Sequence, residues 1–174
     1  MRRILRALWV LALVSPLPAS AELVLRSVSW QLPSAKGASR RGYQPIERWI
    51  QPPSAKVVSR PRVMVTVVNR GPKPAEGAVL RYAIAARQFK IGQTGGEGTW
   101  TVPFYLAERR VARVGANEVK EVPINDLVID VFLKKAFRAG YWPDALRIQV
   151  MVEPRTGEGL EQRLLEQTLP VVTQ

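Results

Sequence analysis

The stretch VMVTVVNRGPKPAEGAVLRY, Val63 to Tyr82, decides the fold that we predict for this chain. In its first half, one side of an extended chain would present Val63, Val65 and Val67, and the other side would present Met64, Thr66 and Val68. Such a period of two is typical of a strand with one buried face. Asn69-Arg70-Gly71-Pro72 then interrupts the pattern: glycine supplies a positive φ at no steric cost, and proline cannot donate to a sheet. A second apolar run, Ala78 to Ala85, follows the break. The stretch therefore predicts a β-hairpin.

Runs of the same kind recur along the chain. Glu22 to Gln31 predicts a first strand with a small irregularity near Arg26-Ser27. Further strands are predicted at Thr99 to Leu106, Glu118 to Pro123, Leu146 to Val152 and Arg163 to Val172. Pro103 places its run at a sheet edge or a bulge. About seven short strands separated by Gly/Pro turns predict an all-β fold, an immunoglobulin-like antiparallel β-sandwich with one short helix.

That helix is predicted over residues 125–139. Asp126, Asp130, Lys134 and Arg138 are each four residues apart, so a helix gathers them into one stripe with the acids at its N-terminal end. Most of the apolar residues fall on the other side, and Asn125 and Gly140 are typical caps for the two ends. A strand from Leu127 to Leu133 is the alternative, because β-branched residues are common there.

The N-terminus predicts export. Met1 to Ala21 combines early arginines, the apolar run Ala7 to Val14 and the small residues Ala19-Ser20-Ala21, which is the pattern of a secretory signal peptide cleaved before Glu22. The apolar run is shorter than the roughly 20 residues of a transmembrane helix. We expect residues 22–174 to form one domain, free of a transmembrane anchor, in the periplasm or outside the cell. The chain has no cysteine, so we expect core burial alone to stabilise it.

A long basic loop is predicted over residues 32–61, where the strand pattern disappears. Its bases are Lys36, Arg40, Arg41, Arg48, Lys56 and Arg60, against the single acid Glu47. Trp49 is predicted to pin the loop within a short helical turn, Pro45 to Ile50. Charge steering around a few aromatic anchors is typical of a contact surface. The candidate binding residues are Arg40, Arg41, Tyr43, Arg48, Trp49, Arg60 and Trp142.

Composition argues against most catalytic chemistry. Histidine and cysteine are absent, which removes the commonest general base and metal ligand and the thiolate nucleophile. The carboxylates occur in scattered positions that solvated surfaces explain, so we predict no enzyme, no catalytic residues, no metal and no cofactor. The Gly-rich run Ile91 to Trp100 lacks a phosphate-loop ending and predicts a hairpin tip. Aromatic residues, including Trp100 and Tyr141, offer possible platforms for sugars, while core packing is the default for Trp30, Tyr82 and Trp100.

Two segments carry a resemblance. ELVLRSVSW followed by RPRVMVTVVNRGPKPAEGAVLRY resembles the opening of bacterial cell-adhesion-related immunoglobulin-like domains, and VMVEPRTGEGLE, Val150 to Glu161, is similar to their penultimate strand and turn. The match covers about half of the chain after the signal peptide. The long basic loop, the helix and the lack of an Asn-rich final turn depart from that pattern. The resemblance implies a non-enzymatic module outside the cytoplasm.

Two functions follow as hypotheses. The first is a non-catalytic structural or protein-binding module of the bacterial envelope or cell surface, whose partner is another envelope or surface protein. The alternative is a module that binds carbohydrate or an anionic polymer, such as lipopolysaccharide, through the basic loop. A formal net charge of +12 would attract anionic surfaces. Because the chain is exported in either case, no nucleic-acid partner is expected.

Overall fold

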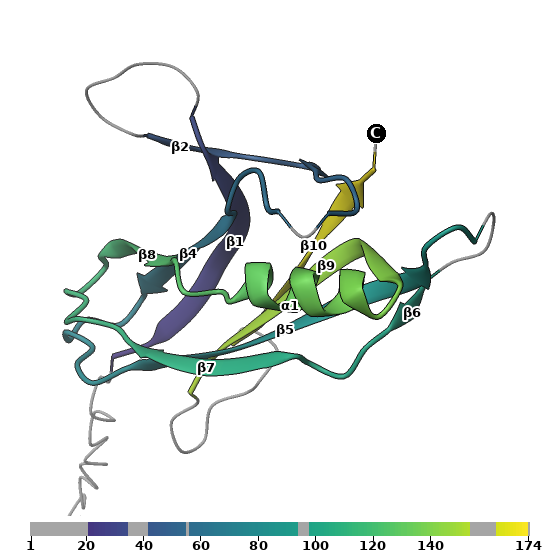
Figure 1. Cartoon of the computed structure of the whole chain (residues 1–174). Helices are drawn as coiled ribbons and strands as arrows, with labels where there is room; N and C mark the ends of the chain where they lie inside the picture. The colour runs from purple at the N-terminus through teal and green to yellow at the C-terminus, as the bar shows by residue number, and fades with distance from the viewer. Residues whose placement is uncertain (1–20, 35–41, 55, 94–97, 154–162, 174) are drawn as a thin grey trace, which may run out of the picture.

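The computed structural model describes residues 21–34, 42–54, 56–93, 98–153 and 163–173, and within them the chain folds into two packed β-sheets (Figure 1). The smaller sheet contains, in spatial order, β2 (Tyr43–Pro45), β1 (Leu23–Pro33), β4 (Arg62–Asn69) and β8 (Val119–Ile124). The larger sheet contains, in order, β3 (Trp49–Ile50), β10 (Leu164–Val172), β9 (Tyr141–Val152) and β5 (Val79–Lys90). The two short strands β6 (Thr99–Trp100) and β7 (Tyr105–Arg110) both pair with β5.

The core lies between the sheets. Alternate residues of β4, namely Val63, Val65 and Val67, are fully buried, as are Leu80 and Ile84 of β5. The chain passes from one sheet to the other after β2, β3, β4, β7 and β8, and crossing connections of this kind are typical of immunoglobulin-like sandwiches. The predicted fold class, all-β with one short helix in an immunoglobulin-like sandwich, is therefore confirmed.

The predicted hairpin is wrong, although both of its strands exist. β4 pairs with β1 and β8, whereas β5 pairs with β9, β6 and β7, so the two strands belong to different sheets. Both strands have a buried face, and the backbone hydrogen bonds of each strand go to other strands instead of to each other. The connection that the sequence marks with Gly71 and Pro72 therefore crosses between the sheets.

The other strand predictions agree closely with the structure. A register shift between Leu25 and Ser27 confirms the irregularity predicted in the first strand. The run Thr99 to Leu106 is divided into β6 and β7, which lie on either side of Pro103. Both of these strands lie at the edge of the larger sheet, as the proline required. The predicted hairpin tip lies partly outside the described residues, but β5 and β6 do pair on either side of it.

The single helix of the described residues, α1 (Ile129–Arg138), confirms the preference for a helix over a strand and corrects its start. Val128, not Asn125, is the N-cap, and it adopts φ 40 without a side-chain cap. Leu133 and Ala136 face the core, and Phe132 stacks on Phe104 at 3.9 Å between ring centroids. At the other end Gly140 has the predicted left-handed φ of 78°.

The loop at 32–61 is more structured than predicted. Instead of a helical turn, residues 49–50 form β3, which pairs in parallel with Val171 and Val172 at the end of β10. Gln51 is fully buried, and its side chain accepts a hydrogen bond from Val58 N–H and donates to the carbonyls of Pro52 and Lys56. A buried amide that is satisfied in this way ties Pro52, Lys56 and Val58 to the end of β3.

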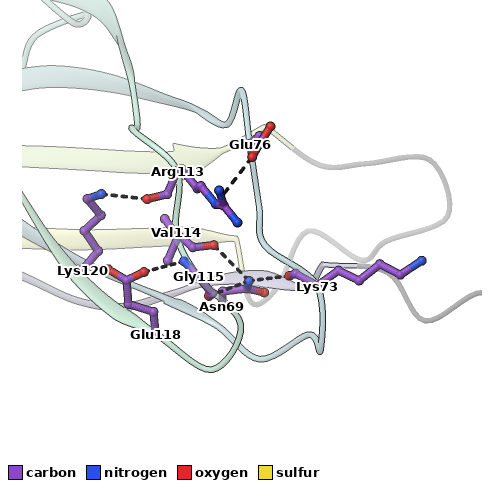
Figure 2. Close-up of polar contacts among 8 residues, drawn as sticks. All are labelled: Asn69, Lys73, Glu76, Arg113, Val114, Gly115, Glu118 and Lys120. Atoms are coloured by element: carbon purple, nitrogen blue, oxygen red, sulfur yellow. Dashed lines mark hydrogen bonds and ion pairs between the residues drawn. The ribbon is translucent and has the colours of Figure 1, made fainter.

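A second buried amide organises the opposite end of the sandwich (Figure 2). Asn69 is fully buried, and its Nδ2 donates to the carbonyls of Lys73, Val114 and Gly115 at 2.8, 3.3 and 2.9 Å. Its Oδ1 accepts from the N–H groups of Gly71 and Glu22 at 3.0 and 3.2 Å. One side chain therefore joins the start of β1, the β4–β5 connection and the segment before β8.

Candidate functional site

The predicted binding residues do not form one surface. Arg40 and Arg41 lie outside the described residues. The guanidinium of Arg62 lies 3.5 Å from the ring centroid of Tyr43, which is exposed on the edge strand β2. Arg48 is exposed, and Arg60 makes an ion pair of 3.0 Å with Asp130 of α1. The described part of the basic loop therefore presents charge with Tyr43 as its one exposed aromatic side chain.

The two tryptophans predicted for this surface are corrections. Trp49 and Trp142 are both fully buried, so neither is an accessible contact residue. Trp49 extends from β3 into the core, while Trp142 donates its indole N–H to the carbonyl of Gln51 at 3.2 Å and contacts Phe137 edge-on. Trp142 is thus tied by a hydrogen bond to the loop segment that begins at Gln51. Burial of such large apolar rings stabilises the fold.

A different surface has the properties of a contact site. In β5, Leu80, Tyr82 and Ile84 face the core, so the intervening residues Arg81 and Ala83 point away from it. The register extends this side across the sheet: Ala83 lies beside Leu106 of β7 and Gln149 of β9, and Met151 lies beside Leu164 of β10. We call this side of the larger sheet the outer face; its key residues are Ala83, Trp100, Leu106, Arg147, Met151 and Leu164.

A hollow of about 490 Å³ occupies the middle of the outer face. Its floor includes the small side chain of Ala83, and its walls include Leu106, Met151 and Leu164. Leu106 is 72% exposed and Leu164 48% exposed, although both are aliphatic. Apolar residues that gather around a concave surface mark contact sites more often than scattered ones do. We refer to this feature as the Ala83 hollow.

Next to the hollow, Trp100 lies partly buried on the outer face. The Arg147 guanidinium lies 4.2 Å from the Trp100 ring centroid, and the Arg87 guanidinium lies 5.9 Å from it. Arg87 is fixed by Asp144 at 2.9 Å, and Arg147 lies 3.7 Å from Glu166. The Nε of Arg147 is buried and has no hydrogen-bond partner among the residues that the structure describes. Tryptophan, arginine and methionine are the residues that interface cores favour.

The charges on the outer face largely cancel. Arg81 lies 3.1 Å from Glu153 and 3.9 Å from Glu108, and Gln149 donates to Glu166 at 2.8 Å. The chain as a whole has a net charge of +12, so this face differs from the rest of the sequence. Paired charges with an apolar centre suit a protein contact better than a polyanion contact.

The outer face continues into a polar cleft of about 610 Å³ at the β5–β6 end. Its lining includes Gln88, Trp100, Tyr141 and Asp144. Tyr141 is 45% exposed. Two of the aromatic residues named as sugar platforms therefore lie on one cleft, and they do so outside the basic loop.

One ionisable group has a shifted pKa. Tyr82 is buried in the core and donates its hydroxyl to Asp126 at 3.2 Å. Burial and then the nearby Asp126 carboxylate raise the pKa of Tyr82 well above its usual range. Its ring packs against Tyr105 at 6.1 Å between centroids. The group is a neutral hydrogen-bond donor that links β5 to the segment before α1.

The sequence interpretation missed Leu106, Ala83 and the other aliphatic residues of the outer face. The available signal was the alternation in Tyr105–Arg110, which places Leu106 on the side of Glu108 and Arg110. An apolar residue among outward charges is unusual enough to note. The default prediction of a core position for Trp100 is wrong, because the ring lies on the outer face.

Within the described residues, no group of three or more histidine, cysteine or acidic side chains is placed to hold a metal ion. The described part of the chain also contains no helix of the length and apolarity needed to span a membrane.

Comparisons with known proteins give likeness of fold only. No family model matches the sequence, and no curated protein matches it. A CARDB domain from Pyrococcus furiosus, solved in complex with di-metal ions, is 12% identical with a TM-score of 0.42, covering 88% of this chain and 96% of that one. This is the kind of domain that the sequence resembles, and the likeness does not extend to function.

Two glycosidase structures show similar likeness. A β-glucosidase from Erythrobacter marinus is 15% identical with a TM-score of 0.39, and a β-D-glucoside glucohydrolase from Trichoderma reesei is 15% identical with a TM-score of 0.41. Each match covers 87% of this chain but only 16% and 19% of the glycosidases. The chain therefore corresponds to less than a fifth of either enzyme.

Proposed function

We propose that the protein is a non-catalytic, exported binding module that docks another envelope or surface protein on its outer face. The observation that carries the proposal is the Ala83 hollow, with Leu106 exposed at its rim. Leaving this side chain in water forgoes about 1.5–3 kcal/mol of burial free energy, which a partner would supply. Trp100 and Arg147 provide the adjacent aromatic and guanidinium contacts typical of binding hot spots.

Export rests on the sequence. The signal-peptide pattern of Met1 to Ala21 supports it, and residues 1–20 lie outside the described residues. N-terminal sequencing of the protein recovered from the periplasm or medium should begin at Glu22. Recovery of a full-length chain from the cytoplasm would contradict export.

Site-specific photo-crosslinking tests the docking surface. A photoreactive phenylalanine analogue replaces Leu106 or, as a matched control, Val119, which is 49% exposed on β8 of the other sheet. We expect a discrete protein adduct from position 106 and none from position 119. Ala83→Arg should remove the adduct because it fills the hollow, whereas Thr66→Arg on β4 should leave it. Equal adducts from both positions, or none from position 106, would refute the proposal.

The cleft at the β5–β6 end supports a second candidate, a carbohydrate subsite. Trp100 and Tyr141 offer aromatic surface beside the polar side chains Gln88 and Asp144, the combination that sugar recognition uses. A soluble glycan array probed with the exported protein tests it. Binding that Tyr141→Ala abolishes and Tyr43→Ala leaves intact would support this candidate, and a blank array would remove it.

A further inference from the structure

The rim of the Ala83 hollow is also a free sheet edge. β7 pairs with β5 at six register positions, from Val79 opposite Arg110 to Ile84 opposite Tyr105. In the described part of the chain, no other strand pairs with β7, which runs along the front of the molecule in Figure 1. In an antiparallel strand, alternate residues direct both backbone groups away from the neighbour. With respect to the described residues, β7 therefore presents unpaired N–H and C=O groups along its outer edge.

The N-terminal end of this edge is held firmly. Phe104, just before β7, stacks on Phe132 of α1, with 3.9 Å between the ring centroids and 11° between the ring planes. Tyr105 packs against Tyr82. A preorganised edge costs less entropy on binding than a mobile one.

Edge and hollow are adjacent, since Leu106, Ala107 and Glu108 all line the hollow. A strand added beyond β7 would lie about 4.8 Å away, and its side chains opposite Leu106 and Glu108 would project from the outer face. One added strand could therefore satisfy the free backbone groups and contribute an apolar side chain beside Leu106.

The outward side chains of β7 specify the complementary sequence. Leu106 is apolar, Glu108 has 67% of its side chain exposed, and Arg110 is exposed. Opposite charges facing each other across two strands stabilise the pair, and like charges destabilise it. An antiparallel partner strand that complements β7 therefore has, from its N-terminus, an acid, any residue, a base, any residue and an aliphatic residue.

Building on the docking function proposed above, we propose that the partner contributes an extended segment that adds to β7 as an antiparallel strand. The segment carries the order acid–x–base–x–aliphatic, which sets its acid against Arg110, its base against Glu108 and its aliphatic side chain against Leu106. This mode obtains affinity from main-chain hydrogen bonds and specificity from alternate side chains.

Synthetic peptides provide the probe. The matched peptide is acetyl-Thr-Glu-Thr-Lys-Thr-Leu-Thr-amide, and the control exchanges Glu and Lys without changing composition. Fluorescence anisotropy of labelled peptides with the exported protein should show about tenfold tighter binding of the matched peptide, because two attractive pairs become two repulsive ones. The double variant E108K/R110E should reverse the preference.

Two further variants separate strand addition from side-chain contact alone. Leu106→Ser should weaken both peptides. Methylation of alternate backbone nitrogens, in the set that faces β7, should abolish binding of the matched peptide, while methylation of the other set should not. The proposal is overturned if neither peptide binds at millimolar concentration, if E108K/R110E fails to reverse the preference, or if both methylated peptides bind.

The experiments distinguish this proposal from the docking function. Suppose that the photoreactive residue at position 106 gives an adduct that Ala83→Arg removes, while the matched and exchanged peptides bind equally. That result would refute strand addition and leave the docking function standing. A concentration-dependent dimer that Glu108→Pro abolishes, by removing an outward N–H of β7, would assign the β7 edge to a second copy and would overturn the proposed partner.

Discussion

Replacement of Asn69 by aspartate should be among the most destabilising single-atom changes in this protein. The side chain is fully buried, and its Nδ2 donates to three backbone carbonyls at 2.8, 2.9 and 3.3 Å. Asn69→Asp keeps the shape and the acceptor Oδ1 but places an oxygen, and a charge, against those carbonyls. Leaving one buried polar group unsatisfied costs about 1–3 kcal/mol. Because the substitution removes two short hydrogen bonds, we expect a decrease of about 3–5 kcal/mol in the free energy of unfolding.

Urea denaturation followed by tryptophan fluorescence measures this decrease. Asn117→Asp is the matched control, because Asn117 is exposed in the same part of the fold and its φ of 56° is one that aspartate tolerates. The control should change stability by less than about 0.5 kcal/mol. The deficit of Asn69→Asp should also shrink in acid, since protonation removes the buried charge and restores a donor. A decrease below about 1 kcal/mol at neutral pH would refute the role assigned to Asn69.

Three more predictions concern the core, the helix and the buried tyrosine. Trp49→Ala should lower the free energy of unfolding by about 3–5 kcal/mol, as measured by urea denaturation, because the ring is fully buried. An unchanged denaturation midpoint would contradict a core position for Trp49. Lys134→Pro should cost about 3 kcal/mol in the middle of α1, whereas Asp130→Pro should cost clearly less because position 130 lies in the first turn, where its N–H has no acceptor within the helix; equal losses would contradict the observed start. The raised pKa of Tyr82 means that above about pH 10 the unfolded chain releases its proton first. Stability should therefore fall by up to about 1.4 kcal/mol per pH unit as pH rises, and Tyr82→Phe, but not Tyr43→Phe, should flatten that fall in alkaline denaturation curves.

The local pattern of the chain predicted what depends on local physics. Alternation identified β4, β5 and β9, and even the bulge near Arg26 follows from a break in that alternation. The left-handed Gly140 at the end of α1 could be predicted because few other residues adopt that conformation cheaply.

Pairing could not be predicted in this way. Nothing within Val63 to Tyr82 indicates that β4 and β5 enter different sheets, because both have one buried face and either arrangement buries it. The burial of Trp49 depends on a parallel contact with Val171, from the far end of the chain.

The outer face shows both effects together. The residue type of Leu106 and its outward position were readable from the sequence. The hollow was not, because it requires Ala83, Met151 and Leu164 from three other strands to meet beside it. Sites that several strands build appear only once the register is known.

The parallel contact between β3 and β10 also constrains the order of events during folding. Among the described residues, the only strand partners of Trp49 and Ile50 are Val171 and Val172, so the two sides of this contact are far apart in the sequence. Closing so large a loop is slow, and contacts of this kind form late. In a chain that is synthesised from its N-terminus, the Trp49 ring has no β10 to pack beside until Val171 and Val172 have been made. Until then the indole is exposed to solvent, where a chaperone that binds apolar side chains would recognise it.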